Sequence, residues 1–262
     1  MDRRQLLDRA AHDGDERILL AHILDKCEQS RRRNVPAATD FLSPAAQRSA
    51  REMLHAAGIR TGVAFCGGYE NAERRLLVFL PDWQEENDGG DYMTALRCIY
   101  HGEGTLTHRD LLGALMAQGV TREKLGDLLA AEGSADLIVS RDIAPYLLQN
   151  LTGAGRVRFD VHEIALPALR VPAPDVKEIR DTVSALRLDA VAASGFSLSR
   201  GRAQELISSG RVQINHRETL KSDAPVAQGD VISARGLGKF EVAAVGGLSR
   251  KGRTAVTLRR YL

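Results

Sequence analysis

The sequence predicts an α+β protein made of several parts. Helical and strand-like patterns alternate through the middle of the chain, and two short helical patterns followed by strand patterns fill its C-terminal end. The segment VPAPD at 171–175 holds two prolines and is typical of a linker. We therefore expect an N-terminal helical part with a β-hairpin at residues 1–72, a middle α/β domain at 73–170, a linker at 171–180, and a C-terminal αα-turn with a small β-sheet at 181–262.

Two helices and a hairpin are predicted in the N-terminal part. Apolar residues recur with helical period through 15–33, and this helix ends in Arg31–Arg33. Basic residues at that end either complement the helix dipole or contact a polyanion. Ser43 as N-cap and Pro44 at the first helical position begin the second helix. The hairpin strands are expected at 59–66 and 74–80.

The middle domain is predicted to alternate strands and helices. Thr107 is expected to cap a helix at 106–117, and Thr121 with Glu123 close behind predicts another helix at 121–131. The other expected elements are strands at 95–100, 135–140, 156–161 and 163–166 and a helix at 143–151.

The C-terminal domain is expected to begin with two short helices. Gly195 is predicted to end the first helix in a left-handed conformation, and Ser199 to cap the second. Val212–Ile214 then alternates as a strand does. Arg200 and Arg202 fall in the first turn of the second helix, where the helix dipole disfavours cations. They therefore point either to solvent or to a polyanion, such as phosphate at the exposed amides of that turn.

Charge is divided unequally along the chain. The formal net charge is +2, but residues 175–262 carry 15 Lys and Arg against 9 Asp and Glu, whereas the first 174 residues carry 21 against 25. A basic C-terminal third predicts a polyanionic partner at that end. The acidic remainder leaves room for a protein partner through the N-terminal part.

Composition also limits the function classes that we expect. No apolar run approaches the roughly 20 residues that span a bilayer, and the N-terminus has no apolar core of a signal peptide, so we expect a cytoplasmic protein without a membrane partner. Cys27, Cys66 and Cys98 lie far apart, and the histidines form no ligand pair. We therefore expect buried free thiols, no metal site and no cofactor.

One ordered set of residues carries a specific resemblance. Its members are Arg187-Leu188-Asp189, Gly195, Ser199-Arg200, Ala203, Leu206-Ile207, Gly210, Val212, Ile214-Asn215 and Gly229-Asp230. This order resembles the RNA-binding module first seen in ribosomal small-subunit protein four, the S-four (S4) domain, which implies RNA backbone lying across two helices. The resemblance implies RNA-facing positions at Arg187, Ser199, Arg200, Arg202, Arg211 and Lys221. His216 stands where that family usually has a glycine.

Basic residues continue in two later turns of this domain. The first turn carries Arg235 and Lys239, and the second carries Arg250, Lys251 and Arg253. Cations at hairpin tips cannot join a core, so these residues either contact phosphates or keep the surface soluble.

The full order of parts resembles the YlmH family of bacterial S4 proteins. The motifs that carry this resemblance are Phe41-Leu42-Ser43-Pro44, Gly67-Gly68-Tyr69, Ala72-Glu73-Arg74, Thr107–Gly113, Thr121–Asp127 and Arg235–Phe240. The family implies a middle domain of RNA-recognition type, structured rRNA or tRNA as the ligand, and association with the ribosome. Some members are linked to quality control on large ribosomal subunits that retain peptidyl-tRNA.

The middle domain offers a candidate second RNA surface. His108, Arg109, Arg122 and Lys124 are expected in first helical turns, where they either meet phosphate or close internal ion pairs. Typical recognition domains stack bases on aromatic strands, and strand 156–161 offers Phe159 alone.

Two alternatives to a non-enzymatic RNA-binding protein stay open. One is an RNA-modifying enzyme with an S4 domain, and the other is an interaction protein linked to cell division. The sole Arg-Leu-Asp lies inside the S4 module rather than in a pseudouridine synthase domain, and Gly102-Glu103-Gly104 lacks the third glycine of a nucleotide loop. Neither a P-loop nor a nucleophile elbow occurs. We therefore expect no catalytic residue.

Overall fold

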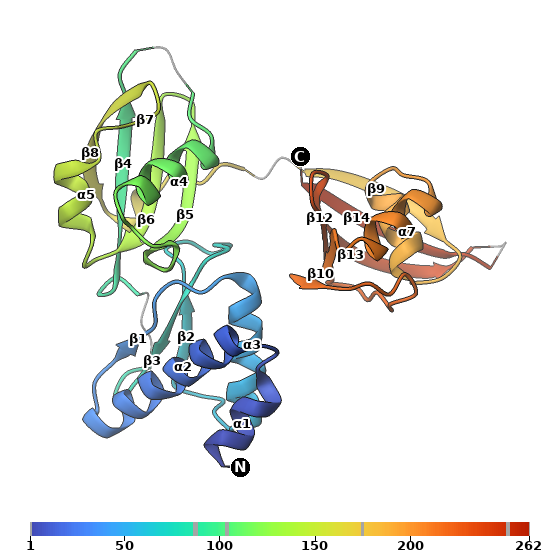
Figure 1. The fold of residues 1–262 in the computed structure, drawn as a ribbon, viewed down its shortest axis with the longest axis horizontal. Helices are drawn as coiled ribbons and strands as arrows, with labels where there is room; N and C mark the ends of the chain where they lie inside the picture. Colours follow the sequence, from blue (N-terminus) through green and yellow to red (C-terminus); the bar gives the residue numbers. More distant parts are fainter. Residues whose placement is uncertain (1, 86–88, 103–104, 174–175, 250–251, 262) are drawn as a thin grey trace. The chain divides into compact units, whose positions relative to one another are not determined.

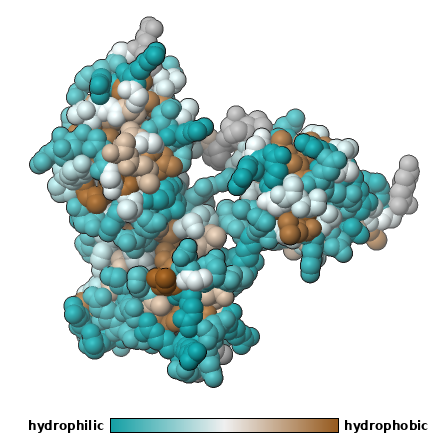
Figure 2. Space-filling view, viewed as in Figure 1, coloured by the Kyte–Doolittle hydropathy of each residue, from teal (hydrophilic) through white to brown (hydrophobic). Residues whose placement is uncertain are grey.

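The computed structural model describes residues 2–85, 89–102, 105–173, 176–249 and 252–261, which form an α+β fold (Figure 1). Two compact units divide the chain, Met1–Pro172 and Ala173–Leu262. None of the described helices is long and apolar enough to span a membrane. Figure 2 shows mostly hydrophilic residues on the visible face of both units, with apolar residues in separate patches.

Three helices and a small sheet form the N-terminal part of the first unit. They are α1 (Arg3–Ala10), α2 (Gly14–Arg33), α3 (Pro44–Ala56), β1 (Ala37–Ala38), β2 (Val63–Cys66) and β3 (Leu76–Phe79), with strand order β1-β3-β2. The Ser43 hydroxyl accepts the amide of Ala46 at 3.2 Å, so the predicted start of α3 is confirmed. Leu77 and Phe79 of β3 face the helices and close this core.

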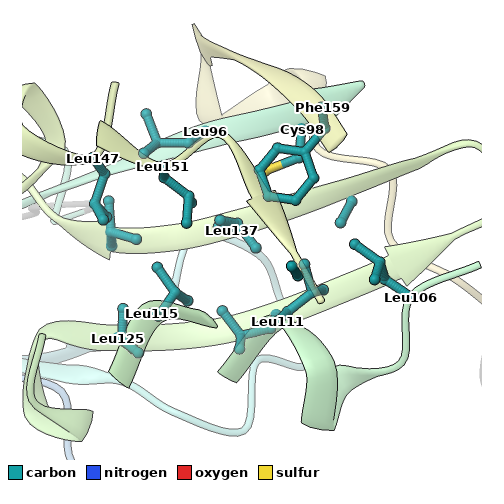
Figure 3. Close-up of a cluster of buried hydrophobic side chains, with 14 of the residues drawn as sticks. Leu96, Cys98, Leu106, Leu111, Leu115, Leu125, Leu137, Leu147, Leu151 and Phe159 are labelled. Carbon is teal, nitrogen blue, oxygen red and sulfur yellow. The ribbon is translucent and has the colours of Figure 1, made fainter. Parts of the chain in front are cut away.

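The middle part of the first unit is an antiparallel sheet with helices on one face. Its elements are β4 (Met93–Tyr100), α4 (His108–Ala117), β5 (Leu125–Ala131), β6 (Ser134–Ser140), α5 (Ala144–Asn150), β7 (Gly153–Ala154) and β8 (Val157–Ile164). The strand order β5-β6-β4-β8-β7 contains the β-α-β-β-α-β arrangement of ferredoxin-like and RNA-recognition domains. Figure 3 shows Leu96, Cys98 and Leu137 of the sheet in one buried cluster with Leu111 and Leu115 of α4. Thr107 and Asp110 form a capping box at the start of α4, which confirms the predicted cap.

Two element predictions for the middle part are wrong. Only Arg122–Lys124 makes a helical turn, of 3₁₀ type, and the rest of the predicted helix at 121–131 is strand β5. Pairing with β6 and burial of Leu125 and Leu128 overrode a sequence pattern that resembles a helix start. The two strands predicted at 156–161 and 163–166 are one strand, β8.

The two parts of the first unit share a second core. Met93 and Ile138, on the sheet face opposite α4 and α5, pack with Leu76 and Val78 of β3 and with Phe41. One face of the middle sheet is therefore buried by helices and the other largely by the N-terminal part. A domain boundary at residue 72 would separate β3 from β1 and β2, with which it pairs.

The second unit is a six-stranded antiparallel sheet with two helices on one face. Its elements are β9 (Val176–Val183), α6 (Leu188–Gly195), α7 (Arg200–Ser208), β10 (Val212–Ile214), β11 (Arg217–Glu218), β12 (Val231–Ala234), β13 (Gly238–Leu248) and β14 (Thr254–Tyr261), in the order β11-β10-β12-β13-β14-β9. The predicted linker is too long, because residues 176–180 belong to β9 and pair with β14.

Two turns in the second unit depend on residues in the left-handed conformation. The prediction that Gly195 ends α6 in this conformation is wrong, because Ser197 adopts it instead, with φ 55°. Gly195 is needed for a different reason: a Cβ atom there would overlap the Phe240 ring. Phe240 packs edge-on against Phe196 with ring centroids 4.9 Å apart. Asn215 and His216 have φ 51° and 66° between β10 and β11, so His216 adopts the left-handed conformation that glycine usually supplies.

We expect Gly195→Ala to destabilise the second unit by about 1–3 kcal/mol, because the added methyl group must displace a fully buried ring. Denaturant-dependent hydrogen exchange of the α6 and α7 amides measures this change. Gly201→Ala is the matched control, since Gly201 lies in α7 with no atom near its Cβ position and should gain about 0.5–1 kcal/mol. Equal effects of the two variants would contradict the assigned role of Gly195.

Candidate nucleic-acid interface

A buried carboxylate organises the cations at the start of α6 and α7. Asp189 is fully buried, and its oxygens accept hydrogen bonds from Arg187 at 3.3 Å, from Arg200 at 3.0 Å and from Gln204 at 2.9 Å. The Arg187 and Arg200 side chains are 41% and 49% exposed. One carboxylate therefore holds two guanidinium groups side by side at the surface, and their combined charge stays positive.

The ionisation of Asp189 follows from these contacts. Burial alone would raise the pKa of its carboxyl, but hydrogen bonds from Gln204 and Arg200 and the charges of Arg200 and Arg187 outweigh it, so the pKa is lowered. The carboxylate stays charged at neutral pH and keeps both arginines in place.

The first turn of α7 lies beside this cluster. The Ser199 hydroxyl accepts the Arg202 amide at 3.2 Å, which confirms the predicted N-cap. Arg202 is 56% exposed and pairs with Glu205 at 2.7 Å, an exposed contact that is worth little and breaks easily. Positive side chains and helix amides thus lie together, an arrangement that suits phosphate.

Lys221 is brought to the same place by the loop between β11 and β12. Ser222 and Ala224 accept the amides of Asp189 and Leu188 through their carbonyl oxygens, at 3.0 and 2.9 Å. The loop is therefore fastened to the first turn of α6, with Lys221 exposed. We call Arg187, Ser199, Arg200, Arg202 and Lys221 the helix-pair surface.

Arg211 and Arg235 form a second basic pair at the other end of α7. The Arg235 amide donates to the Arg211 carbonyl oxygen at 3.0 Å, and the Arg211 guanidinium donates to the Arg235 carbonyl oxygen at 3.2 Å. Both residues are exposed. α7 has nine residues and is about 13 Å long, so this pair lies about one helix length from the first turn of α7.

Two other predicted RNA-facing residues that the structure describes, Lys239 and Arg253, do not join that surface. Phe240 faces the helices, so its neighbour Lys239 faces away from them, with its amine 5.2 Å from the Tyr261 ring. Burial lowers the pKa of Lys239. Arg253 donates to the hydroxyl and carbonyl oxygens of Thr182 on β9. Arg250 and Lys251 lie outside the described residues.

Two of the four residues of the candidate second surface in the middle domain make internal contacts. Lys124 lies 2.9 Å from both Asp40 and Asp142, and Arg122 donates to the carbonyl oxygens of Leu125 and Gly126. Burial and the charge of Arg122 lower the pKa of His108, against the opposing charge of Asp127. Arg109 is exposed.

Asp127 joins the two parts of the first unit, a role that sequence reasoning missed. Its carboxylate accepts the Tyr69 hydroxyl at 2.8 Å and the amides of Glu73 and Arg74 at 2.7 and 3.0 Å. The Arg74 guanidinium donates to the carbonyl oxygens of Phe41, Arg122 and Leu125. Burial, reinforced by the charge of Arg122, lowers the pKa of Arg74 to about 10. These residues belong to the YlmH-type motifs, so in this unit the motifs stabilise the contact between the N-terminal part and the middle sheet.

The middle sheet presents no aromatic side chain of β8 on which an RNA base could stack. The face opposite the helices presents Arg97 and Asp136, whose hydrogen bonds measure 2.7 Å, and Asp136 also accepts the Arg170 amide. Phe159 is buried on the helix side, against Tyr100.

Within the described ranges no group of three or more His, Cys, Asp or Glu side chains could hold a metal ion.

We expect Asp189→Asn to destabilise α6 and α7 by about 1.5–3 kcal/mol at pH 7, because hydrogen bonds to a charged acceptor are lost. The folded pKa of Asp189 is lowered, so its contribution is present above the unfolded value of about 4 and is lost as pH falls through the folded value. Hydrogen exchange at pH 7 and in acid measures the difference from the parent protein, which should shrink in acid. Glu205→Gln is the control, because its pair with Arg202 is exposed.

Comparisons with known proteins agree with this architecture. Residues 91–168 match the family described as "Putative RNA-binding domain in YlmH", and residues 186–232 match the S4 domain. Ribosome-associated protein quality control protein P2 of Bacillus subtilis (strain 168) is 37% identical over 223 residues, which are 85% of this chain and 86% of that protein. The structure of cell division protein ylmH from Streptococcus pneumoniae has a TM-score of 0.51 at 18% identity, covering 62% of this chain and 98% of that one, a likeness of fold alone. With a relative this similar over most of both lengths, and with both domains matched in order, the chain belongs to the YlmH family of S4-domain proteins.

Proposed function

We propose that this protein binds structured rRNA or tRNA on the large ribosomal subunit through the helix-pair surface, in quality control of subunits that retain peptidyl-tRNA. The observation that carries the proposal is the buried Asp189 carboxylate, which holds Arg187 and Arg200 beside the capped first turn of α7. A folded RNA presents phosphates along its backbone, and fixed guanidinium groups bind them bidentately at low entropic cost.

The relatives support the ribosomal part of the proposal. The Bacillus subtilis relative is named for ribosome-associated quality control, and 37% identity over 85% of this chain makes a shared role the simplest assignment. The role on large subunits with peptidyl-tRNA is the finer step, and it rests on the family resemblance. The matched descriptions of both domains name no catalytic activity, so binding rather than chemistry is the proposed role.

Arg200→Ala with Arg202→Ala should weaken binding of structured RNA at least tenfold, because two charged contacts worth about 1.5–3 kcal/mol each are removed. The slope of log affinity against log salt should fall by about 2 units, one for each cation that meets a phosphate. Electrophoretic or anisotropy titration of tRNA and rRNA fragments at several salt concentrations measures both quantities.

Lys177→Ala with Arg180→Ala is the matched control, since it removes the same charge from β9, at the opposite edge of the sheet from β10 and β11. This control should keep most of the affinity. Equal losses in both double variants would assign binding to net charge and contradict a specific surface. An affinity that does not change with salt concentration would favour an apolar protein interface instead.

Purified protein incubated with tRNA, rRNA and common cofactors should leave every nucleotide unmodified, because we propose a binding role without chemistry. Mass spectrometry of nucleosides from the digested RNA tests this expectation. A new modified nucleoside that depends on the protein would favour the enzyme alternative.

A further inference from the structure

A basic and aromatic surface at the end of α2 lies outside the surfaces considered so far. Arg31, Arg32 and Arg33 form the last residues of α2, and all three are exposed. Within the part of the chain that the structure describes, none of the three forms an ion pair. The nearby acids Asp25 and Glu28 pair with Arg3 instead.

Capping of the helix dipole accounts for only a fraction of this charge. The C-terminus of a helix carries the equivalent of about half a negative charge. Three arginines exceed that by about two and a half positive charges. Asp82 and Glu85, which line the same hollow as Arg31, offset part of this excess, and the remainder is available to an anionic partner.

Trp83 contacts the residue that follows these arginines. Its indole N–H donates to the carbonyl oxygen of Asn34, the residue that follows Arg33, at 3.0 Å. The side chain is nevertheless 63% exposed, so the ring is held at the surface instead of packing into a core. An oriented, exposed indole next to cations is what single-stranded nucleic acid binds, because bases stack on the ring while cations meet phosphates.

A hollow of ≈ 430 Å³ is lined by Arg31 and Asn34 at the end of α2 and by Asp82, Gln84 and Glu85, which flank Trp83 in sequence. Its exposed lining is more polar than apolar, with Thr61 as a further polar residue, while Cys27, Ile59, Phe79, Leu80 and Pro81 supply the apolar part. A polar rim suits the hydrogen-bonding edge of a nucleobase, since carboxylates accept from base amino groups, whereas an apolar protein anchor prefers an apolar pocket. The acidic residues lie on the Trp83 segment and the arginines on α2, so base-reading and phosphate-binding groups come from different elements.

We propose that Arg31, Arg32, Arg33 and Trp83 form a second RNA site, which takes a short single-stranded segment with one base stacked on Trp83. The proposal goes beyond the function proposed above by placing an RNA contact in the N-terminal part. It shares with that function only the class of ligand, so each can fail without the other.

The chain contains a single tryptophan, so Trp83 reports on this site directly. Decamers of oligo(U), oligo(A) and oligo(C) should quench the fluorescence of the full-length protein at low salt. The affinity measured from this quenching should fall at least tenfold when Arg31→Ala, Arg32→Ala and Arg33→Ala are combined. It should not change in the variant Arg200→Ala with Arg202→Ala. Arg4→Ala, Arg9→Ala and Arg156→Ala combined remove equal charge from exposed positions elsewhere in the unit and should also leave it unchanged.

A fluorescein-labelled decamer gives a second readout that does not need the tryptophan. Trp83→Ala should weaken its binding about 5- to 100-fold, and Trp83→Phe, which keeps a ring, should weaken it less. Circular dichroism verifies that each variant is folded. Absent quenching in the parent protein, or quenching that survives loss of the three arginines, would overturn the proposal. Stronger quenching by a decamer of glutamate than by any oligonucleotide would assign the surface to an acidic protein and overturn it too.

Discussion

The Asp189 carboxylate is the constraint on which the helix-pair surface depends. Two guanidinium groups would repel each other at close range, yet here one buried negative charge holds both, and Gln204 completes its hydrogen bonding. The backbone of the same turn is fastened to Ser222 and Ala224, which brings Lys221 alongside. The carboxylate thus turns residues far apart in sequence into one preorganised cationic surface, and less side-chain freedom remains to be lost when RNA binds.

The first unit uses its charged motifs differently. Asp127, Tyr69 and Arg74 join the N-terminal part to the middle sheet, and Arg97 with Asp136 fills the face that RNA-recognition domains leave open for bases. A buried carboxylate organises charge in both units. Arg97 beside Asp136 is 15% exposed, whereas Arg187 and Arg200 beside Asp189 are 41% and 49% exposed. This difference leaves the guanidinium groups of the helix-pair surface accessible to phosphate, as the proposed function requires.

Sequence patterns predicted those features that depend on neighbouring residues. Ser43, Thr107 and Ser199 cap their helices as expected, since each acts within its own turn. The strand at Leu125–Ala131 and the strand at Val176–Val183 were missed, because pairing with β6 and with β14 decides them. In the candidate site, the S4 resemblance predicted the arginines, whereas the role of Asp189 became visible only from its burial in the structure. The sequence signal for the role of Asp189 was its position in an otherwise apolar helical turn. For Lys239, the alternation of side chains along a strand could have predicted that it points away from the helices, because its neighbour Phe240 is apolar.

Sedimentation of the protein with isolated large ribosomal subunits, in low and in high salt, tests the central claim most directly. We predict co-sedimentation in low salt and steep release as salt rises, with crosslinks from the helix-pair surface to rRNA or to bound tRNA. Co-sedimentation that persists in high salt, or crosslinks to ribosomal proteins alone, would contradict a surface built to hold an RNA backbone.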